Sequence, residues 1–111
     1  MEIVEEKAGD VLIVTLKGRL DTNSSKEAEK QILDRIGAGE HRLVIDLAEL
    51  DYLSSVGLRV LLLAAKRMKA VQGQLAVCTL KPEVATIFDI AGFAAIFRIL
   101  ATRDEAVREL S

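Results

Sequence analysis

The stretch DLAELDYLSSVGLRVLLLAAKRM, residues 46 to 68, predicts the passage from a buried β-strand into the most apolar helix of the chain. The apolar run LVIDLA leads into it, and apolar residues at helical spacing follow. Ser54 and Ser55 lie where the helix is expected to begin. A serine at such a position usually caps the helix. The alternatives here are a cap, a site of modification or a nucleophile.

Outward from this stretch, strand and helix patterns alternate along the chain. Strands are expected at 2–7, 10–17, 41–48, 74–80 and 94–100, and helices at 24–36, 55–71, 81–92 and 102–110. Ser24 and Glu27 fit a capping box at the start of the first helix, and residues 49–53 are expected to form a loop. Buried strands that alternate with helices predict an α/β fold. We expect one domain over residues 1–111, with a mixed, mostly parallel sheet, about four helices and the order β-β-α-β-α-β-α-β-α.

The composition of the chain excludes several classes of function. The 111 residues suffice for one core, and the net charge of -2, with both signs interleaved, gives no basic surface for nucleic acid. Cys78 lies in an apolar run, which predicts a buried thiol without a disulfide or a metal site. The acidic N-terminus does not resemble a signal peptide, and no apolar run is long enough to cross a bilayer. We therefore expect a cytoplasmic monomer with no cofactor and no membrane partner.

The long helix predicts a protein-binding surface if its outer side is open. A stripe expected to face the sheet comprises Leu58, Leu61, Leu62, Ala65 and Met68. Off that stripe lie Val56, Val60 and Leu63, with Arg59 and Arg67 nearby. An exposed apolar patch marks an interaction site, but neighbouring helices could equally cover it.

Two carboxylates are expected near the serines. Asp46 ends one strand and Asp21 follows another, and the carboxyl ends of parallel strands meet at one edge of a sheet. The unpaired amides of the helix start would hold a phosphate on Ser55, and Gly57 would let another protein approach closely. The domain would remain folded when phosphorylated, whereas a partner packed over the serine would be repelled by the added charge.

The segment VIDLAELDYLSSVGLRVLLLAAKRMKA, residues 44 to 70, closely resembles the signature of the STAS family, the anti-sigma factor antagonists of bacterial partner-switching systems. Upstream, LKGRLDTNSSKEAEK is similar to the Gly-x-Leu/Ile-Asp segment of that family. The expected order of elements matches the family over essentially the whole chain. The family's phosphorylated serine corresponds to Ser55. Ser54 stands where many members have Asp, and it is the second candidate.

The resemblance implies a phosphorylation-controlled binding module. The unmodified form would bind an ATP-dependent serine kinase that doubles as an anti-sigma factor, and phosphorylation of Ser55 would break the complex. A PP2C-type phosphatase would restore the binding form. The loop aspartate that lies near the partner interface in the family corresponds to Asp21. The expected partner-binding residues are Asp21, Thr22, Asp46, Ser54, Ser55, Val56, Gly57, Arg59, Val60 and Leu63.

Two alternatives remain. Catalysis by Ser55 would need a base, but the only histidine, His41, begins the preceding strand about 16 Å away. The chain also lacks Gly-x-Ser-x-Gly and a Walker loop, so we expect no enzyme. The other alternative is a STAS scaffold or small-ligand sensor in a signalling complex without a sigma factor.

Overall fold

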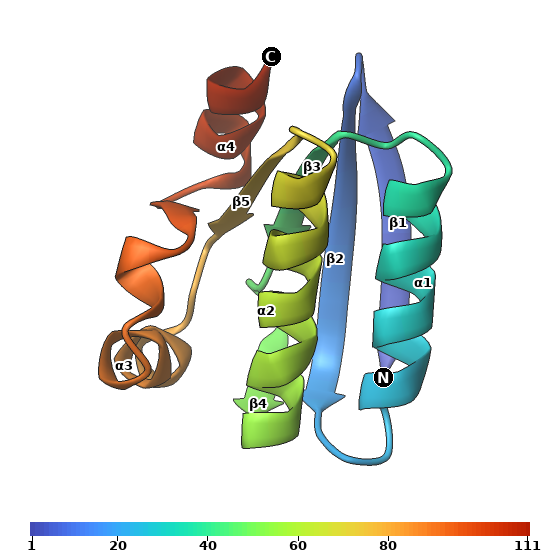
Figure 1. Cartoon of the computed structure of the whole chain (residues 1–111). Coiled ribbons are helices and arrows are strands. Elements are labelled where there is room, and N and C mark those ends of the chain that lie inside the picture. The colour runs from blue at the N-terminus through green and yellow to red at the C-terminus, as the bar shows by residue number, and fades with distance from the viewer.

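The longest strand, β2 (Val11–Leu20), organises the sheet because it pairs with three other strands. The computed structural model describes all 111 residues (Figure 1). The other strands are β1 (Glu2–Ala8), β3 (Arg42–Asp46), β4 (Leu50–Leu53), β5 (Gln74–Cys78) and β6 (Arg98–Leu100). The helices are α1 (Ser25–Gly37), α2 (Ser55–Ala70), α3 (Pro82–Ile90) and α4 (Arg103–Leu110), with a 3-10 turn at Phe93–Ala95.

The sheet has the order β1-β2-β3-β5-β6, with β4 beside the far end of β2. Only β1 and β2 are antiparallel; every other neighbouring pair is parallel. The predicted α/β fold, with four helices and a mixed, mostly parallel sheet, is confirmed. The element order gains one strand and reads β-β-α-β-β-α-β-α-β-α.

The added strand is β4, which occupies the predicted loop at 49–53. The first half of β2 pairs with β3, and its last residues pair with β4 after a register shift between Gly18 and Arg19. Gly18 has a φ of 101°, a conformation that glycine adopts without strain. The prediction of a loop was wrong because Leu50 and Leu53 are buried, so this short segment continues the sheet beyond the end of β3.

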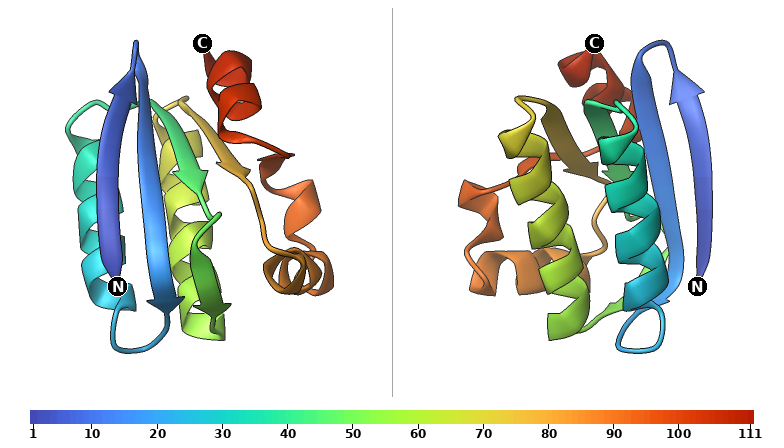
Figure 2. Two further views of the ribbon diagram at one scale, coloured as in Figure 1. Left: turned by 180° about the vertical axis from the view of Figure 1, so that it is seen from behind. Right: turned by 45° about the vertical axis from the view of Figure 1, so that its right-hand side comes forward.

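Two apolar layers lie on opposite faces of the sheet, because successive side chains of a strand point to opposite sides. Helices α1 and α2 lie side by side on one face, as both views of Figure 2 show. Beneath them lies the larger core, which includes Leu12, Val14, Leu16, Leu43 and Ile45. The smaller core packs α4 on the other face against Val11, Ile13, Val44, Ala76 and Cys78. Cys78 is buried as predicted, and burial raises the pKa of its thiol.

Two local predictions were wrong. The capping box at Ser24 does not form, because the Ser24 hydroxyl donates to the carbonyl of Arg19 rather than accepting an amide of the helix. The predicted strand at 94–100 is shorter, since the chain forms a 3-10 turn before β6 begins at Arg98. The aromatic ring of Phe97 packs there against those of Phe88 and Phe93, which draws this segment into the core.

Helix α4 is fixed to the sheet by Arg103. Its Nε donates to Oδ2 of Asp46 at 2.9 Å, and its Nη2 donates to the hydroxyl of Thr15 at 2.8 Å. The Asp46 side chain is 7% exposed, and Arg103 is its ion-pair partner. The hydrogen bond to Asp46 also raises the pKa of Arg103, although partial burial opposes the shift.

We predict that Arg103→Ala lowers the free energy of unfolding by about 1 to 3 kcal/mol, because it leaves the buried Asp46 carboxylate without its counter-ion. Arg98→Ala is the control, since Arg98 makes only a 3.8 Å surface contact with Glu109. Urea unfolding measures both variants. Equal losses for the two variants would contradict the role given to Arg103.

Candidate functional site

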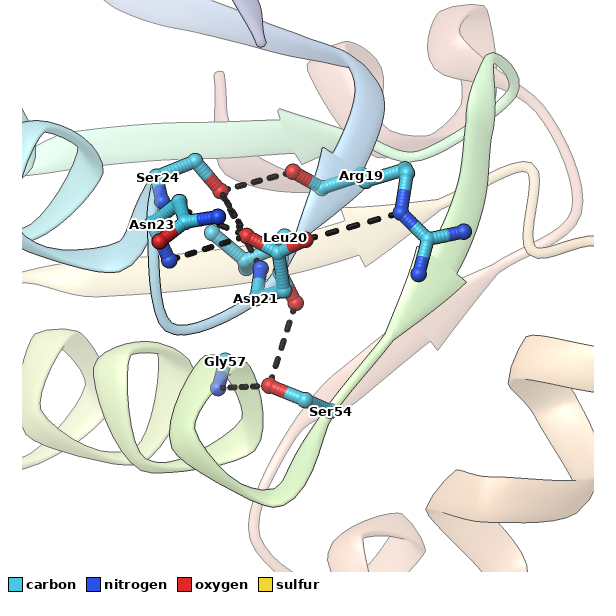
Figure 3. A network of polar contacts seen from close by, with 7 residues as sticks. All are labelled: Arg19, Leu20, Asp21, Asn23, Ser24, Ser54 and Gly57. Atoms are coloured by element: carbon cyan, nitrogen blue, oxygen red, sulfur yellow. Dashed lines mark hydrogen bonds and ion pairs between the residues drawn. The ribbon is translucent and has the colours of Figure 1, made fainter.

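The helix α2 begins at a cap made by Ser54. The Ser54 hydroxyl accepts the N–H of Gly57 at 3.1 Å and donates to the carbonyl of Leu20 at 3.3 Å, so it ties the helix start to the end of β2 (Figure 3). The N–H of Ser54 donates to the same carbonyl at 3.1 Å. Capping was one of the predicted alternatives for the serine pair. The residue that caps α2 is Ser54 and not Ser55.

Ser55, the first residue of α2, is exposed and takes no part in the cap. Its neighbour in the chain therefore performs the structural role that either serine could have filled. The two hydroxyls thus differ in environment, since that of Ser54 is bound inside the fold and Ser55 is exposed.

Gly57 has a structural role that the sequence did not reveal. A Cβ at this position would lie 2.7 Å from the carbonyl oxygen of Leu20 and 2.8 Å from the side chain of Leu53. Gly57 is buried, so the prediction that it opens the helix start to a partner was wrong. Its absent side chain instead lets α2 pack directly on the ends of β2 and β4.

The loop between β2 and α1 is held by Asp21. Its Oδ1 accepts the N–H groups of Asn23 at 3.0 Å and Ser24 at 3.3 Å, and its Oδ2 lies 3.5 Å from Nε of Arg19 (Figure 3). Desolvation alone would raise the pKa of Asp21, but these hydrogen bonds outweigh it and lower the pKa. Asp21 is thus an ionised, partly exposed carboxylate close to the helix start that Ser54 caps.

Asp46 does not join this group, contrary to the prediction. It lies opposite Thr15 in the sheet, whereas Ser54 is bonded to Leu20, five residues further along β2. Five residues of strand span about 17 Å. The strand β4 accounts for the separation, because it carries the chain past the end of β3 before α2 begins. Asp46 is 5% exposed and bound to Arg103, so it is not available to a partner at the serines.

A surface groove lies between α1 and α2, and its lining includes Val56, the residue that follows Ser55. Its volume is about 430 Å³, and its lining residues are Thr22, Ser25, Lys26, Glu29, Val56, Arg59, Val60 and Leu63. Val56 is 37% exposed and Leu63 is half-buried, but Val60 is 3% exposed. The prediction that Val60 lies on an open face was wrong. The buried side of α2 comprises Gly57, Val60, Leu61, Ala64 and Met68, so it is turned from the predicted stripe.

A second exposed feature, near Asp21, was not predicted from the sequence. The guanidinium of Arg19 lies 4.1 Å from the ring centre of Tyr52, and the two residues face each other across β2 and β4. Tyr52 is 43% exposed. The pair could not be predicted because β4 itself was not predicted. The α1 residues of the groove were missed as well, although Thr22, in the loop before α1, was predicted to bind a partner.

No group of three or more His, Cys, Asp or Glu side chains lies close enough together to hold a metal ion. None of the helices is long and apolar enough to cross a bilayer. A larger groove, of about 560 Å³, lies toward the other end of α2 beside Ile96.

Comparison with known proteins assigns the family. The STAS domain family matches residues 2–106. The chain belongs to the STAS domain family. Two relatives are similar in sequence over nearly the whole chain. BtrV, a candidate anti-sigma factor antagonist of Bordetella bronchiseptica, is 41% identical over 96% of this chain and 91% of its own. An anti-sigma F factor antagonist of Paenibacillus polymyxa is 31% identical over 100% of this chain and 93% of its own.

Solved structures confirm the STAS fold. An anti-sigma factor antagonist from Mycobacterium paratuberculosis superposes with a TM-score of 0.90 at 24% identity, over 98% of this chain and 92% of that chain. SpoIIAA in its unphosphorylated form gives 0.77 at 19% identity, over 97% of this chain and 96% of that one. Bacillus SpoIIAA in its phosphorylated form superposes with a TM-score of 0.79 at 20% identity, over 99% of this chain and 100% of that chain. Membership of this family makes the chain a binding module and not an enzyme, as the sequence predicted.

We predict different costs for removing the two hydroxyls. Ser54→Ala should lower the free energy of unfolding by about 1 kcal/mol, because it removes the cap of α2. Ser55→Ala should change it by less than about 0.5 kcal/mol, because the exposed hydroxyl makes no structural contact. Thermal or urea unfolding of the two variants measures the difference. A larger loss for Ser55→Ala would contradict the assignment of the cap.

We also predict that Gly57→Ala destabilises the fold by about 1 to 3 kcal/mol, because the added Cβ would clash with the Leu20 carbonyl and the Leu53 side chain. The matched control is Gly37→Ala in the last turn of α1, where a Cβ would have nothing within 4 Å. That change should leave stability equal or raise it by about 0.4 to 1 kcal/mol. Denaturant midpoints compare the two, and a neutral Gly57→Ala would exclude the close contact.

Proposed function

We propose that this chain is an anti-sigma factor antagonist whose binding is controlled by phosphorylation of Ser55. While Ser55 is unmodified, the chain binds a serine kinase that also acts as an anti-sigma factor, and this binding frees the sigma factor. The observation that carries the proposal is the difference between the two hydroxyls: Ser54 caps α2 inside the fold, and Ser55 stands exposed next to Val56, which lines a groove.

The geometry favours Ser55 over Ser54 as the acceptor. A phosphate on Ser54 would remove the proton that its hydroxyl donates to the Leu20 carbonyl and would place a dianion against that oxygen. A phosphate on Ser55 would disturb neither hydrogen bond of the cap. The kinase would transfer the terminal phosphoryl group of ATP to Oγ of Ser55, the hydroxyl proton would go to a base of the kinase, and ADP would leave. ATP and the base belong to the partner.

The added charge accounts for release. Ser55 precedes Val56, whose exposed side chain lines the groove, and such an apolar surface suits a packed protein interface. Phosphorylation adds about -1.5 to -2 charge there, and its hydration opposes burial under a partner. The fold itself can carry such a group, as the matches to both forms of SpoIIAA indicate for that fold.

The proposed partner surface consists of the exposed residues around the serine. Val56 and Leu63 supply apolar contact, Thr22 and Arg59 line the same groove, and Asp21 supplies a carboxylate close to the helix start. A PP2C-type phosphatase would remove the phosphate and restore the binding form. Val60, Gly57 and Asp46 act through the fold, since all three are buried.

The proposal is tested with anti-sigma serine kinases, including the one encoded nearest to this chain. The purified chain is incubated with each kinase and ATP, and its intact mass is measured. We expect one phosphate on the wild type and on Ser54→Ala, and none on Ser55→Ala. Calorimetry should show binding of the unmodified chain and a loss of at least about 100-fold when phosphoserine is encoded at position 55.

Val56→Asp tests the surface. It should abolish binding and leave the unfolding midpoint near that of wild type, because the side chain is exposed. The same change at Val71, which is equally exposed at the other end of α2, is the matched control and should leave binding intact. A chain that binds no such kinase, or binds equally when phosphorylated, would refute the switch.

A further inference from the structure

The charges of α2 are of one sign. The helix carries Arg59, Lys66, Arg67 and Lys69 and contains no Asp or Glu. None of these four side chains makes an ion pair, although most other basic residues of the chain do; the pairs include Lys30 with Asp34 and Arg35 with Glu5. The helix is therefore an uncompensated basic element in a chain whose net charge is -2.

Arg59 is the one of these cations placed next to Ser55. Residues four apart on a helix are neighbours, with roughly 5 to 6 Å between their Cβ atoms. Arg59 is exposed, as Ser55 is, and it lines the groove between α1 and α2. An anion on residue 55 and a cation on residue 59 also have the favourable order, with the anion toward the helix N-terminus.

We propose that Arg59 is the counter-ion of phosphoserine 55 and holds the phosphate in an ion pair within α2. This inference rests on the proposed phosphorylation of Ser55 and adds a regulatory role for a second residue. The guanidinium fork matches phosphate oxygens and can donate two hydrogen bonds. Phosphorylation then changes the docking surface twice, because it adds a dianion at residue 55 and withdraws the Arg59 guanidinium from the groove.

Charged groups on the neighbouring elements must be distinguished from Arg59. From α1, Lys26 and Glu29 line the groove. From the end of β2, Arg19 is paired with Asp21, and from β4, Asp51 is paired with Lys81 at 2.6 Å. Lys26 is the only other cation of the groove, and it has no ion-pair partner, so it is the competing candidate.

The test uses phosphoserine encoded at position 55 during translation, so that it depends on no kinase. The second pKa of the phosphate is followed by phosphorus NMR in the wild type, Arg59→Gln, Lys26→Gln and Arg67→Gln. An ion pair favours the dianion, so Arg59→Gln should raise the phosphate pKa by about 0.2 to 0.4 unit relative to wild type. Salt near 1 M should abolish the difference, because the Debye length falls to about 3 Å.

Lys26→Gln and Arg67→Gln should leave the phosphate pKa within about 0.1 unit of wild type. Arg67 serves as a matched control, since it is an exposed arginine without an ion pair on the same helix, twelve residues beyond Ser55. An unchanged pKa in Arg59→Gln, or a rise confined to Lys26→Gln, would overturn the role of Arg59. Neither result would bear on whether a kinase modifies Ser55, which the mass measurement tests separately.

Discussion

The close contact of Gly57 with the Leu20 carbonyl fixes the geometry of this end of the molecule. Because no Cβ intervenes, the first turn of α2 lies directly on the ends of β2 and β4. The Leu20 carbonyl then receives the N–H and the hydroxyl of Ser54, which turns that serine inward. One glycine and one carbonyl thus determine which serine is structural and which is exposed.

In the proposed mechanism, that arrangement separates the residues that stabilise the fold from the residue that is regulated. The cap, the glycine contact and the Asp21 turn hold the loop between β2 and α1 and the start of α2 without using Ser55. A residue that contributes nothing to the fold can be modified without unfolding it, and only an interface placed over it responds. Under the proposed switch, the binding module would need no internal conformational change. The charge on Ser55, with Arg59 as its proposed counter-ion, would act on the partner directly.

The features that depend on local sequence patterns were predicted correctly. Apolar periodicity identified all four helices and the buried strands, and the string around Ser55 identified the family. Prediction from the sequence failed for features that are determined by contacts between residues distant in the sequence. The strand β4 is four residues long and exists only because the end of β2 offers it a partner. Without β4, Asp46 was placed beside the serines. The buried side of α2 is shifted by one residue from the predicted stripe, so that Val60 is buried. This shift follows from the close packing of α2 on β2 and β4 that Gly57 permits.

Amide hydrogen exchange on the unmodified chain and on the chain with phosphoserine encoded at position 55 tests the central claim most directly. If Ser54 alone caps α2, the amides from Leu61 to Met68 should exchange within about twofold of the same rate in both forms, with changes confined to the first turn. Loss of protection along the whole of α2, or in β2 and β4, would contradict the account. It would mean that the phosphate acts by unfolding the helix rather than by charging an intact surface.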